Sequence, residues 1–349
     1  MPVTINDIAR ELGFAKSTVS RALNGGSIAP EKRDAVMKMV EQMGFEADPT
    51  ARRLSSGRCE LTIGLLALNL DFGVVTGKIK EIQRRLSERG FNVPIHSYGS
   101  FGGGESVDEI GLVRLLAREK PRAIVCHTTE LPDSTFEELR RFRENGGGVV
   151  CFDTLAPDDF DQVRFDFADD AEQVARFFFA NGHRRALMMT HGRAQTNELR
   201  WSGWQKAARE AGIRVSRDEF WEETGALYEE AGFRFAERFL ALEKGVRPTA
   251  VYAINDNVAA GFMTGISEAG LQIPRDVAVI GHDDQAMCRC LTPRLSSFVH
   301  PVSAIAQATV EVLLERLEQN GEFSPPIHRV VRGELVNRAS SQFAIAQHA

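Results

Sequence analysis

Charged and amide side chains of this sequence follow several apolar runs, where buried strands of a parallel sheet would end. Asp153, Asn255 and Asp283 each stand within two residues of the end of such a run, and Arg200 begins a helical segment. In doubly wound α/β sheets, ligands bind outside the carboxyl ends of the strands. Carboxylate, amide and guanidinium groups gathered there can each hydrogen-bond adjacent hydroxyls, so the pattern favours recognition of a polyol without chemistry.

The same residues could instead have structural or catalytic roles. Asp153, Asp256 and Asp284 would also suit caps of the helices that follow their strands, and Arg200, Asn255 and Asp283 could be purely structural. A glycosidase-like acid/base pair of Asp153 and Asp283 requires a fixed separation that sequence spacing does not establish.

Enzyme and metal chemistry find little support. The sequence has no G-x-S-x-G or H-E-x-x-H motif, and its glycine runs lack the spacing of phosphate-binding loops. His282, Asp283 and Asp284 are adjacent and would point in different directions after a strand, which favours a turn over a metal site. We therefore expect no catalytic residue, no metal and no cofactor.

A second group of polar residues lies near the N-terminus. The outward face of a predicted helix over residues 16–23 carries short hydrogen-bonding groups and two long cations: Lys16, Ser17, Thr18, Ser20 and Arg21. Such side chains can read base edges from the major groove. The alternative is a solvated face on a protein-binding helical bundle.

Two further helices would position this face. Thr4 suits the cap of a first helix, with Asp7 in the place of a capping-box acid, and Gly13 ends it. Pro30 suits the first position of a third helix, and Gly44 its end. Two short helices around a glycine turn, followed by a third, predict a helix-turn-helix domain.

Composition agrees with a small basic module on an acidic body. The chain has 349 residues and a net charge of -6, but residues 1–58 hold nine Lys/Arg against seven Asp/Glu. This balance disfavours indiscriminate coating of nucleic acid and permits local phosphate binding. The five cysteines have no zinc spacing, and we expect reduced thiols, no membrane span, no export signal and a cytoplasmic location.

Three ordered motifs in the first 54 residues resemble the lactose repressor (LacI/GalR) family of transcriptional regulators. They are Thr4-Ile5-Asn6-Asp7-Ile8-Ala9, Ser17-Thr18-Val19-Ser20-Arg21-Ala22-Leu23-Asn24 and Ala51-Arg52-Arg53-Leu54. The resemblance implies base contacts by Lys16, Ser17 and Arg21, and phosphate contacts by Thr4, Thr18, Ser20 and Asn24. Ala15 and Ala47 stand where the family usually has Ser and Pro, so only the mode of binding transfers, not an operator sequence.

The resemblance also implies a hinge helix. In the family, paired hinge helices of a dimer enter the minor groove, and a leucine at the position of Leu54 wedges open the central base step with Ala51 packed nearby. The alternative is that Leu54 merely anchors a linker.

The rest of the chain predicts an α/β body. Apolar strand-like runs separated by helical segments cover residues 61–68, 91–96, 123–127, 149–152, 186–191, 250–254 and 277–281. The length favours two lobes, and the resemblance implies a two-lobed core of the type I periplasmic-binding-protein kind. The expected division is residues 1–46 for the helix-turn-helix domain, 47–58 for the hinge helix and 59–340 for the body, with lobe 1 at about 59–160 and 298–324 and lobe 2 at about 161–297 and 325–340.

The family match falls on the polar residues described first. It implies effector contacts by Arg200, Asn255, Asp283 and Asp153, and an apolar wall at Phe72. His127 and Leu227 are further expected contacts, although Leu227 replaces a common aromatic residue and leaves the identity of the sugar open.

Together these features predict a homodimeric DNA-binding regulator, most simply a repressor, whose operator affinity depends on a small effector such as a sugar or sugar derivative. The rival is a cytosolic carbohydrate-binding protein without regulatory DNA binding. The basic helix-turn-helix segment argues against that rival. The few residues after the last strand predict no coiled-coil tail, and hence a dimer.

Overall fold

The computed structural model describes most of the chain. The described residues are 3–23, 28–43, 45, 59–67, 70, 73–97, 109–127, 131–153, 155–192, 195–319 and 324–342. They divide into two compact units, residues 1–60 and 61–349. The expected hinge helix over residues 47–58 lies outside the described residues, as do Asn24, Ala51, Leu54 and Phe72.

The first unit is a three-helix domain. Its helices are α1 (Ile5–Leu12), α2 (Lys16–Leu23) and α3 (Pro30–Met43). Thr4 caps α1 in a capping box with Asp7, and Gly13 ends it with a φ of 64°. The core contains Ile8, Val19 and Val36, one fully buried residue from each helix. The three helices, the cap residues of α1 and the start of α3 at Pro30 are confirmed, whereas the expected end of α3 at Gly44 lies outside the described residues.

The body contains two six-stranded sheets with helices around them. We call the sheet of order β11-β5-β4-β3-β1-β2 and its helices lobe 1, and the sheet of order β12-β10-β9-β8-β6-β7 and its helices lobe 2. Where the register between described residues is defined, neighbouring strands are parallel, except that β10 and β12 are antiparallel. The expected two-lobed α/β core is confirmed.

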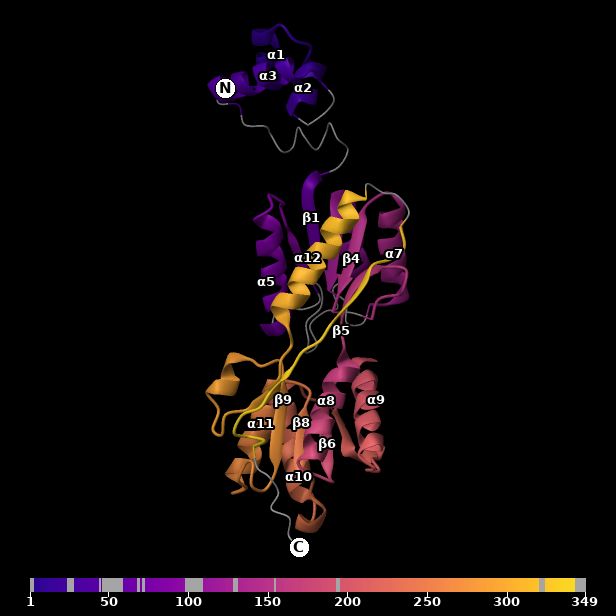
Figure 1. The fold of residues 1–349 in the computed structure, drawn as a ribbon, viewed down its shortest axis with the longest axis vertical. Coiled ribbons are helices and arrows are strands. Elements are labelled where there is room, and N and C mark those ends of the chain that lie inside the picture. The colour runs from indigo at the N-terminus through magenta and orange to yellow at the C-terminus, as the bar shows by residue number, and fades with distance from the viewer. Residues whose placement is uncertain are drawn as a thin grey trace. The chain divides into compact units, whose positions relative to one another are not determined.

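Lobe 1 combines segments that are far apart in the sequence. Its strands are β1 (Cys59–Ala67), β2 (Ile95–Ser97), β3 (Pro121–His127), β4 (Gly148–Phe152), β5 (Asp161–Phe165) and β11 (His328–Val331). Its helices are α5 (Gly73–Ser87), α6 (Glu109–Arg118), α7 (Asp133–Glu144) and α12 (Val302–Glu318). Helix α12 returns from lobe 2 and packs beside α5 against β4 and β5 (Figure 1).

Lobe 2 repeats the arrangement. Its strands are β6 (Ala186–His191), β7 (Phe220–Glu223), β8 (Ala250–Ala253), β9 (Ala278–His282), β10 (Ser296–Phe298) and β12 (Leu335–Val336). Its α-helices are α8 (Phe167–Ala180), α9 (Gln195–Glu210), α10 (Tyr228–Ala241) and α11 (Asp256–Glu268). Helices α10 and α11 approach so closely that a Cβ at Gly261 would lie 2.1 Å from the Glu229 carbonyl oxygen.

The sheet order corrects two expected lobe boundaries. Strands β5 and β11 pair with each other in the lobe 1 sheet, although residues 161–165 and 328–331 were expected in lobe 2. The chain therefore crosses after Phe165 and again between Val331 and Leu335. Neither strand forms a continuous apolar run, because β11 is an edge strand and β5 carries three polar residues, so hydropathy did not reveal them.

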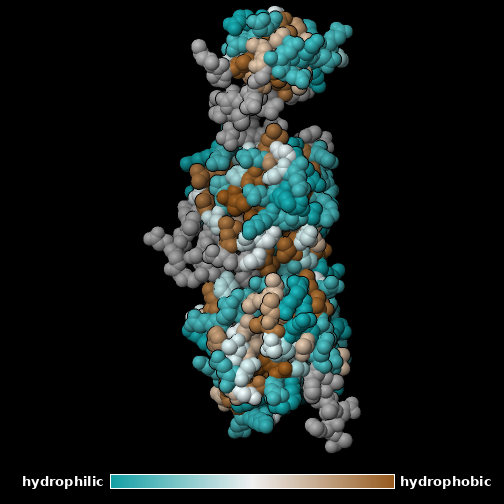
Figure 2. Space-filling model, turned by 90° about the vertical axis from the view of Figure 1, so that its left-hand side faces the viewer, coloured by the Kyte–Doolittle hydropathy of each residue, from teal (hydrophilic) through white to brown (hydrophobic). Residues whose placement is uncertain are grey.

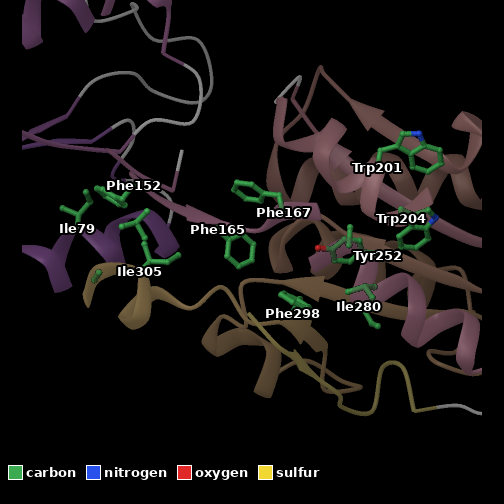
Figure 3. Close-up of a cluster of buried hydrophobic side chains, with 14 of the residues drawn as sticks. Ile79, Phe152, Phe165, Phe167, Trp201, Trp204, Tyr252, Ile280, Phe298 and Ile305 are labelled. Atoms are coloured by element: carbon green, nitrogen blue, oxygen red, sulfur yellow. The ribbon is translucent and has the colours of Figure 1, made fainter. Parts of the chain in front are cut away.

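One hydrophobic cluster extends from lobe 1 into lobe 2. In Figure 3, Phe165 and Phe167 lie between Phe152 of lobe 1 and Tyr252 and Phe298 of lobe 2. The Phe165 and Phe167 rings meet edge to face at 5.1 Å. The first crossing is therefore packed into the core.

Hydrophilic residues predominate on the face of the body seen in Figure 2, with hydrophobic residues scattered among them. Among the described residues, no helix is both long and apolar enough to cross a membrane.

Candidate functional site

The candidate cleft begins with a buried ion pair at the end of β4. Lys78 of α5 donates a hydrogen bond to Asp153. His300 Nε2 lies 3.4 Å from the Asp153 carboxylate, and His127 Nε2, at the end of β3, lies 3.7 Å from it. Burial opposes ionisation of Asp153, but Lys78 and His300 outweigh it and hold its pKa well below the usual range.

Arg200 belongs to a second polar group, in lobe 2. Its Nε lies 3.3 Å from the carboxylate of Asp170 on α8, and its guanidinium stacks 4.7 Å from the centre of the Phe167 ring. Asp170 is fully buried, and burial raises its pKa to about 7 although Arg200 opposes the rise. Arg200 is thus held by Asp170 and Phe167, and the Tyr252 hydroxyl is a further hydrogen-bonding neighbour of its guanidinium.

His282 connects this group to the crossing segments. Its Nδ1 lies 2.8 Å from the Tyr252 hydroxyl and 3.6 Å from the Asp170 carboxylate. Its ring lies 5.9 Å from that of His300, and the Phe165 ring contacts both histidines. Burial holds the pKa of His282 well below its usual value and that of His300 at about 4, so both rings are neutral near pH 7.

Asp283 occupies a sharp turn after β9. Its φ is 101° and that of Asp284 is 50°, and its N–H donates to the Phe298 carbonyl at 2.8 Å. The side chain is only 5% exposed, and burial raises its pKa well above the usual range. Within the described residues, Asp283 Oδ2 has no hydrogen-bond partner. A buried, unsatisfied carboxyl oxygen is costly unless a ligand or water completes it.

Asn255 has a structural role that its position after β8 also predicts. Its side-chain oxygen accepts the Val258 N–H at 2.8 Å and caps α11, while its amide nitrogen lies 2.8 Å from His191 Nε2. Asn255 rather than Asp256 is therefore the cap. Asp256 instead accepts hydrogen bonds from Ser297 and from the Gln285 N–H.

Leu227 lies beside this corner of lobe 2, half-buried at the start of α10. The ring of its neighbour Tyr228 meets that of His191 at 5.4 Å. Since His191 also contacts Asn255, the start of α10 and the end of β8 are joined through one imidazole.

One cluster of histidine and carboxylate side chains has a spacing that could suit a metal ion. His282, Asp283 and His300 offer ligand atoms within 4.8 Å of one another. However, Lys78 Nζ lies 3.2 Å from His300 Nε2, so a divalent cation would be placed beside an ammonium group. These residues fit a hydrogen-bonding site better than a metal site.

The candidate DNA-reading face lies on α2. Lys16, Ser17 and Arg21 are exposed, whereas Thr18 and Ser20 are half-buried. Arg21 Nε donates to the Ser17 carbonyl at 3.3 Å and runs along the helix surface. Buried Val19 and Ala22 hold the opposite face of α2 against the domain core.

Comparison with known proteins identifies both parts of the chain. Residues 4–48 match the model of bacterial regulatory proteins of the lacI family, and residues 175–341 match a periplasmic binding protein-like domain. The HTH-type transcriptional regulator GalS of Salmonella typhimurium is 29% identical over 317 residues, which cover 90% of this chain and 89% of GalS. The chain thus joins a segment that matches the lacI family model to a periplasmic binding protein-like domain, and it is similar to transcriptional regulators of the LacI family.

Solved structures of LacI-family regulators share the fold of this chain. The lac repressor dimer bound to operator and the anti-inducer ONPF has a TM-score of 0.78 at 21% identity, and the match covers 98% of this chain and 99% of that one. The complex of the transcriptional regulator CelR with cellobiose has a TM-score of 0.69 at 21% identity, covering 97% and 100%. The relatives are regulators and not enzymes, in agreement with the absence of catalytic motifs.

The structure of this chain brings some predicted residues into shared contacts. Asp153 and His127 share one polar group. Lys78 and His300 are the main residues of this group that the sequence did not reveal. Lys78 carries a usable signal, since it lies four residues after Val74 and four before Ile82, both buried on the same face of α5. His300 has no such signal, because only the folded crossing brings it to Asp153.

Proposed function

We propose that this chain is a homodimeric LacI-family repressor whose affinity for a pseudo-palindromic operator is controlled by a small polyhydroxylated effector. The observation that carries the effector assignment is the buried, unsatisfied Oδ2 of Asp283, close to neutral histidines and charged groups at the ends of strands. Adjacent hydroxyls can supply both donors and acceptors to such groups.

DNA contact is assigned to the exposed face of α2 and to the hinge. Lys16, Ser17 and Arg21 would read bases, with Thr4, Thr18, Ser20 and Asn24 near phosphates, in the way the family resemblance implies. Ala51 and Leu54 would act in the minor groove. Solved relatives support this mode, since the lac repressor binds its operator as a dimer. Because such a regulator acts on DNA inside the cell, we assign it to the cytoplasm.

Effector contact is assigned to Asp153, Arg200, Asn255 and Asp283, with further contacts from the set Phe72, His127 and Leu227. The complex of CelR with cellobiose supports a sugar or sugar derivative as the class of effector. Effector binding would favour one arrangement of the lobes and shift the hinge, with a coupling free energy of about 1–3 kcal/mol.

The proposal is tested in two steps on the full chain. Selection from a random double-stranded DNA library should yield a pseudo-palindromic site, because a dimer presents two copies of α2. Titration of that site with and without sugars, sugar acids, sugar phosphates and polyols should then reveal one class that changes the affinity. A failure to select any specific DNA would favour the rival function, a carbohydrate-binding protein without regulatory DNA binding.

A further inference from the structure

A cavity lies in lobe 2, and its lining residues differ from those of the candidate cleft. Its volume is about 540 Å³, and its lining residues are Arg289, Arg294, Arg338, Ala339 and Gln342. It forms where the C-terminal segment crosses the loop between β9 and β10. The Ser340 N–H donates to the Arg294 carbonyl at 3.0 Å, and Arg338 Nη1 donates to the Leu295 carbonyl at 2.8 Å, which fix the two walls against each other.

The cavity has an excess of positive charge. Arg338 and Arg289 share the carboxylate of Asp284, at 2.6 Å and 3.4 Å. Arg294 is exposed, and its guanidinium has no ion pair or hydrogen bond within the part of the chain that the structure describes. Three guanidinium groups therefore meet one carboxylate, and two positive charges are left uncompensated.

We propose that this cavity binds the phosphate group of a small metabolite. A phosphate monoester carries about two negative charges near neutral pH, which matches the uncompensated charge, whereas one carboxylate carries a single charge. Guanidinium groups bind phosphate oxygens through paired N–H donors. Arg338, with its side chain only 14% exposed, would be the fixed donor, and the more exposed Arg289 and Arg294 would close onto the ligand.

The site would give the regulator a second input. Asp284 anchors two of the three arginines and directly follows Asp283 of the candidate effector cleft. A bound phosphate competes with Asp284 for Arg289 and Arg338, and so acts on the turn that positions Asp283. Any resulting coupling is reciprocal, because each ligand changes the affinity of the other by the same factor.

The test is calorimetric titration of the full chain with inorganic phosphate and with pyrophosphate, at constant ionic strength. The DNA-reading helix also attracts phosphate, so the comparison of variants decides. Arg294→Gln removes the unpaired guanidinium and should weaken phosphate binding about tenfold. Arg275→Gln is the control, since Arg275 is an exposed arginine of the same lobe, paired with Asp276, that does not line the cavity.

The expected result is saturable phosphate binding in the unmodified chain and in Arg275→Gln, and weak binding in Arg294→Gln and Arg289→Gln. Denaturation midpoints without phosphate should be equal for Arg294→Gln and the unmodified chain, because the Arg294 side chain has no hydrogen bond or ion pair to lose among the described residues. Equal phosphate affinity in all four proteins, or no saturable binding, would overturn the proposal. Tighter binding of citrate than of pyrophosphate would overturn the assignment to phosphate.

Discussion

Lys78 and Asp153 form an ion pair in which both side chains are almost completely buried, at 1% and 7% exposure. His300 contacts both members, and it stands between β10 of lobe 2 and α12 of lobe 1. The pair thus joins a strand end in the candidate cleft to a segment that connects the lobes. A change in the charge or position of Asp153 would therefore alter its contact with His300 in the segment that connects the lobes.

Replacing Lys78 should therefore be strongly destabilising. Lys78→Met leaves the Asp153 charge buried without its main partner, and the loss of one member of such a pair costs about 3–5 kcal/mol. The free energy of unfolding of the full chain, measured with a chemical denaturant, checks this value. Lys80→Met on the exposed side of the same helix is the matched control and should change stability little.

The double variant Lys78→Met, Asp153→Asn separates charge from packing. If the buried charge is the cause, the second substitution restores part of the stability that the first removes. An equal or larger loss in the double variant would contradict the electrostatic explanation.

Asp283 should matter for effector binding more than for folding. Its Oδ2 has no partner among the described residues, and burial already raises the pKa of the carboxyl, so Asp283→Ala removes little that stabilises the fold. We expect loss of the thermal shift caused by the effector and retention of operator affinity. Asp158→Ala, at an exposed acid, is the control. An unchanged effector affinity in Asp283→Ala would remove this residue from the site.

Much of the fold can be predicted from the sequence, because helix caps and apolar strands are recognisable from neighbouring residues. The caps at Thr4 and Gly13 and the apolar runs of the central strands depend on neighbouring residues alone. Strands β5 and β11 belong to lobe 1 and not to lobe 2 as expected, because β5 pairs both with β4 and with the distant β11. The three polar residues of β5 and the edge position of β11 hide both strands from hydropathy. Pairing over such a separation leaves no local trace.

In the candidate site too, contacts between residues far apart in the sequence could not be predicted. Residues at strand ends, such as Asp153 and Asp283, can be found from the strand pattern. Their partners cannot, because Lys78 and His300 come from other elements and meet Asp153 only after folding. Asn255 shows that position does not separate a cap from a ligand contact, since the same amide group makes the helix cap.

The stability of the body should fall on acidification. His300 and His191 have pKa values of about 4 in the fold because they are buried, against an ordinary value of 6.5. As the pH falls from 6.5 to 4, the unfolded chain binds these protons and the folded chain does not, so stability is lost in this window. For His300 the loss amounts to about 3 kcal/mol. Asp170 has the opposite sign, since its raised pKa of about 7 favours the fold at lower pH.

A variant isolates the histidine contribution. His300→Gln cannot take up a proton, so the difference in unfolding free energy between this variant and the unmodified chain should shrink or change sign between pH 7 and pH 4. Denaturant titrations at several pH values give both curves. Parallel curves would show that His300 is not the group that titrates.

DNA binding should depend on Arg21 and Leu54 for different reasons. Arg21 is exposed on α2, and loss of a base contact costs about 1–3 kcal/mol, so Arg21→Ala should weaken specific operator binding and relax discrimination between bases. Lys38→Ala on α3 is the control, because Lys38 is also exposed but lies outside the predicted DNA-contacting set.

Leu54→Ala should weaken binding to the specific operator while leaving non-specific DNA binding and effector binding intact, because a wedge acts only at an opened base step. Operator affinity that is unchanged in Leu54→Ala and reduced in Arg21→Ala would reject the hinge wedge while keeping the α2 interface. Unchanged affinity in both variants would reject the proposed DNA interface as a whole.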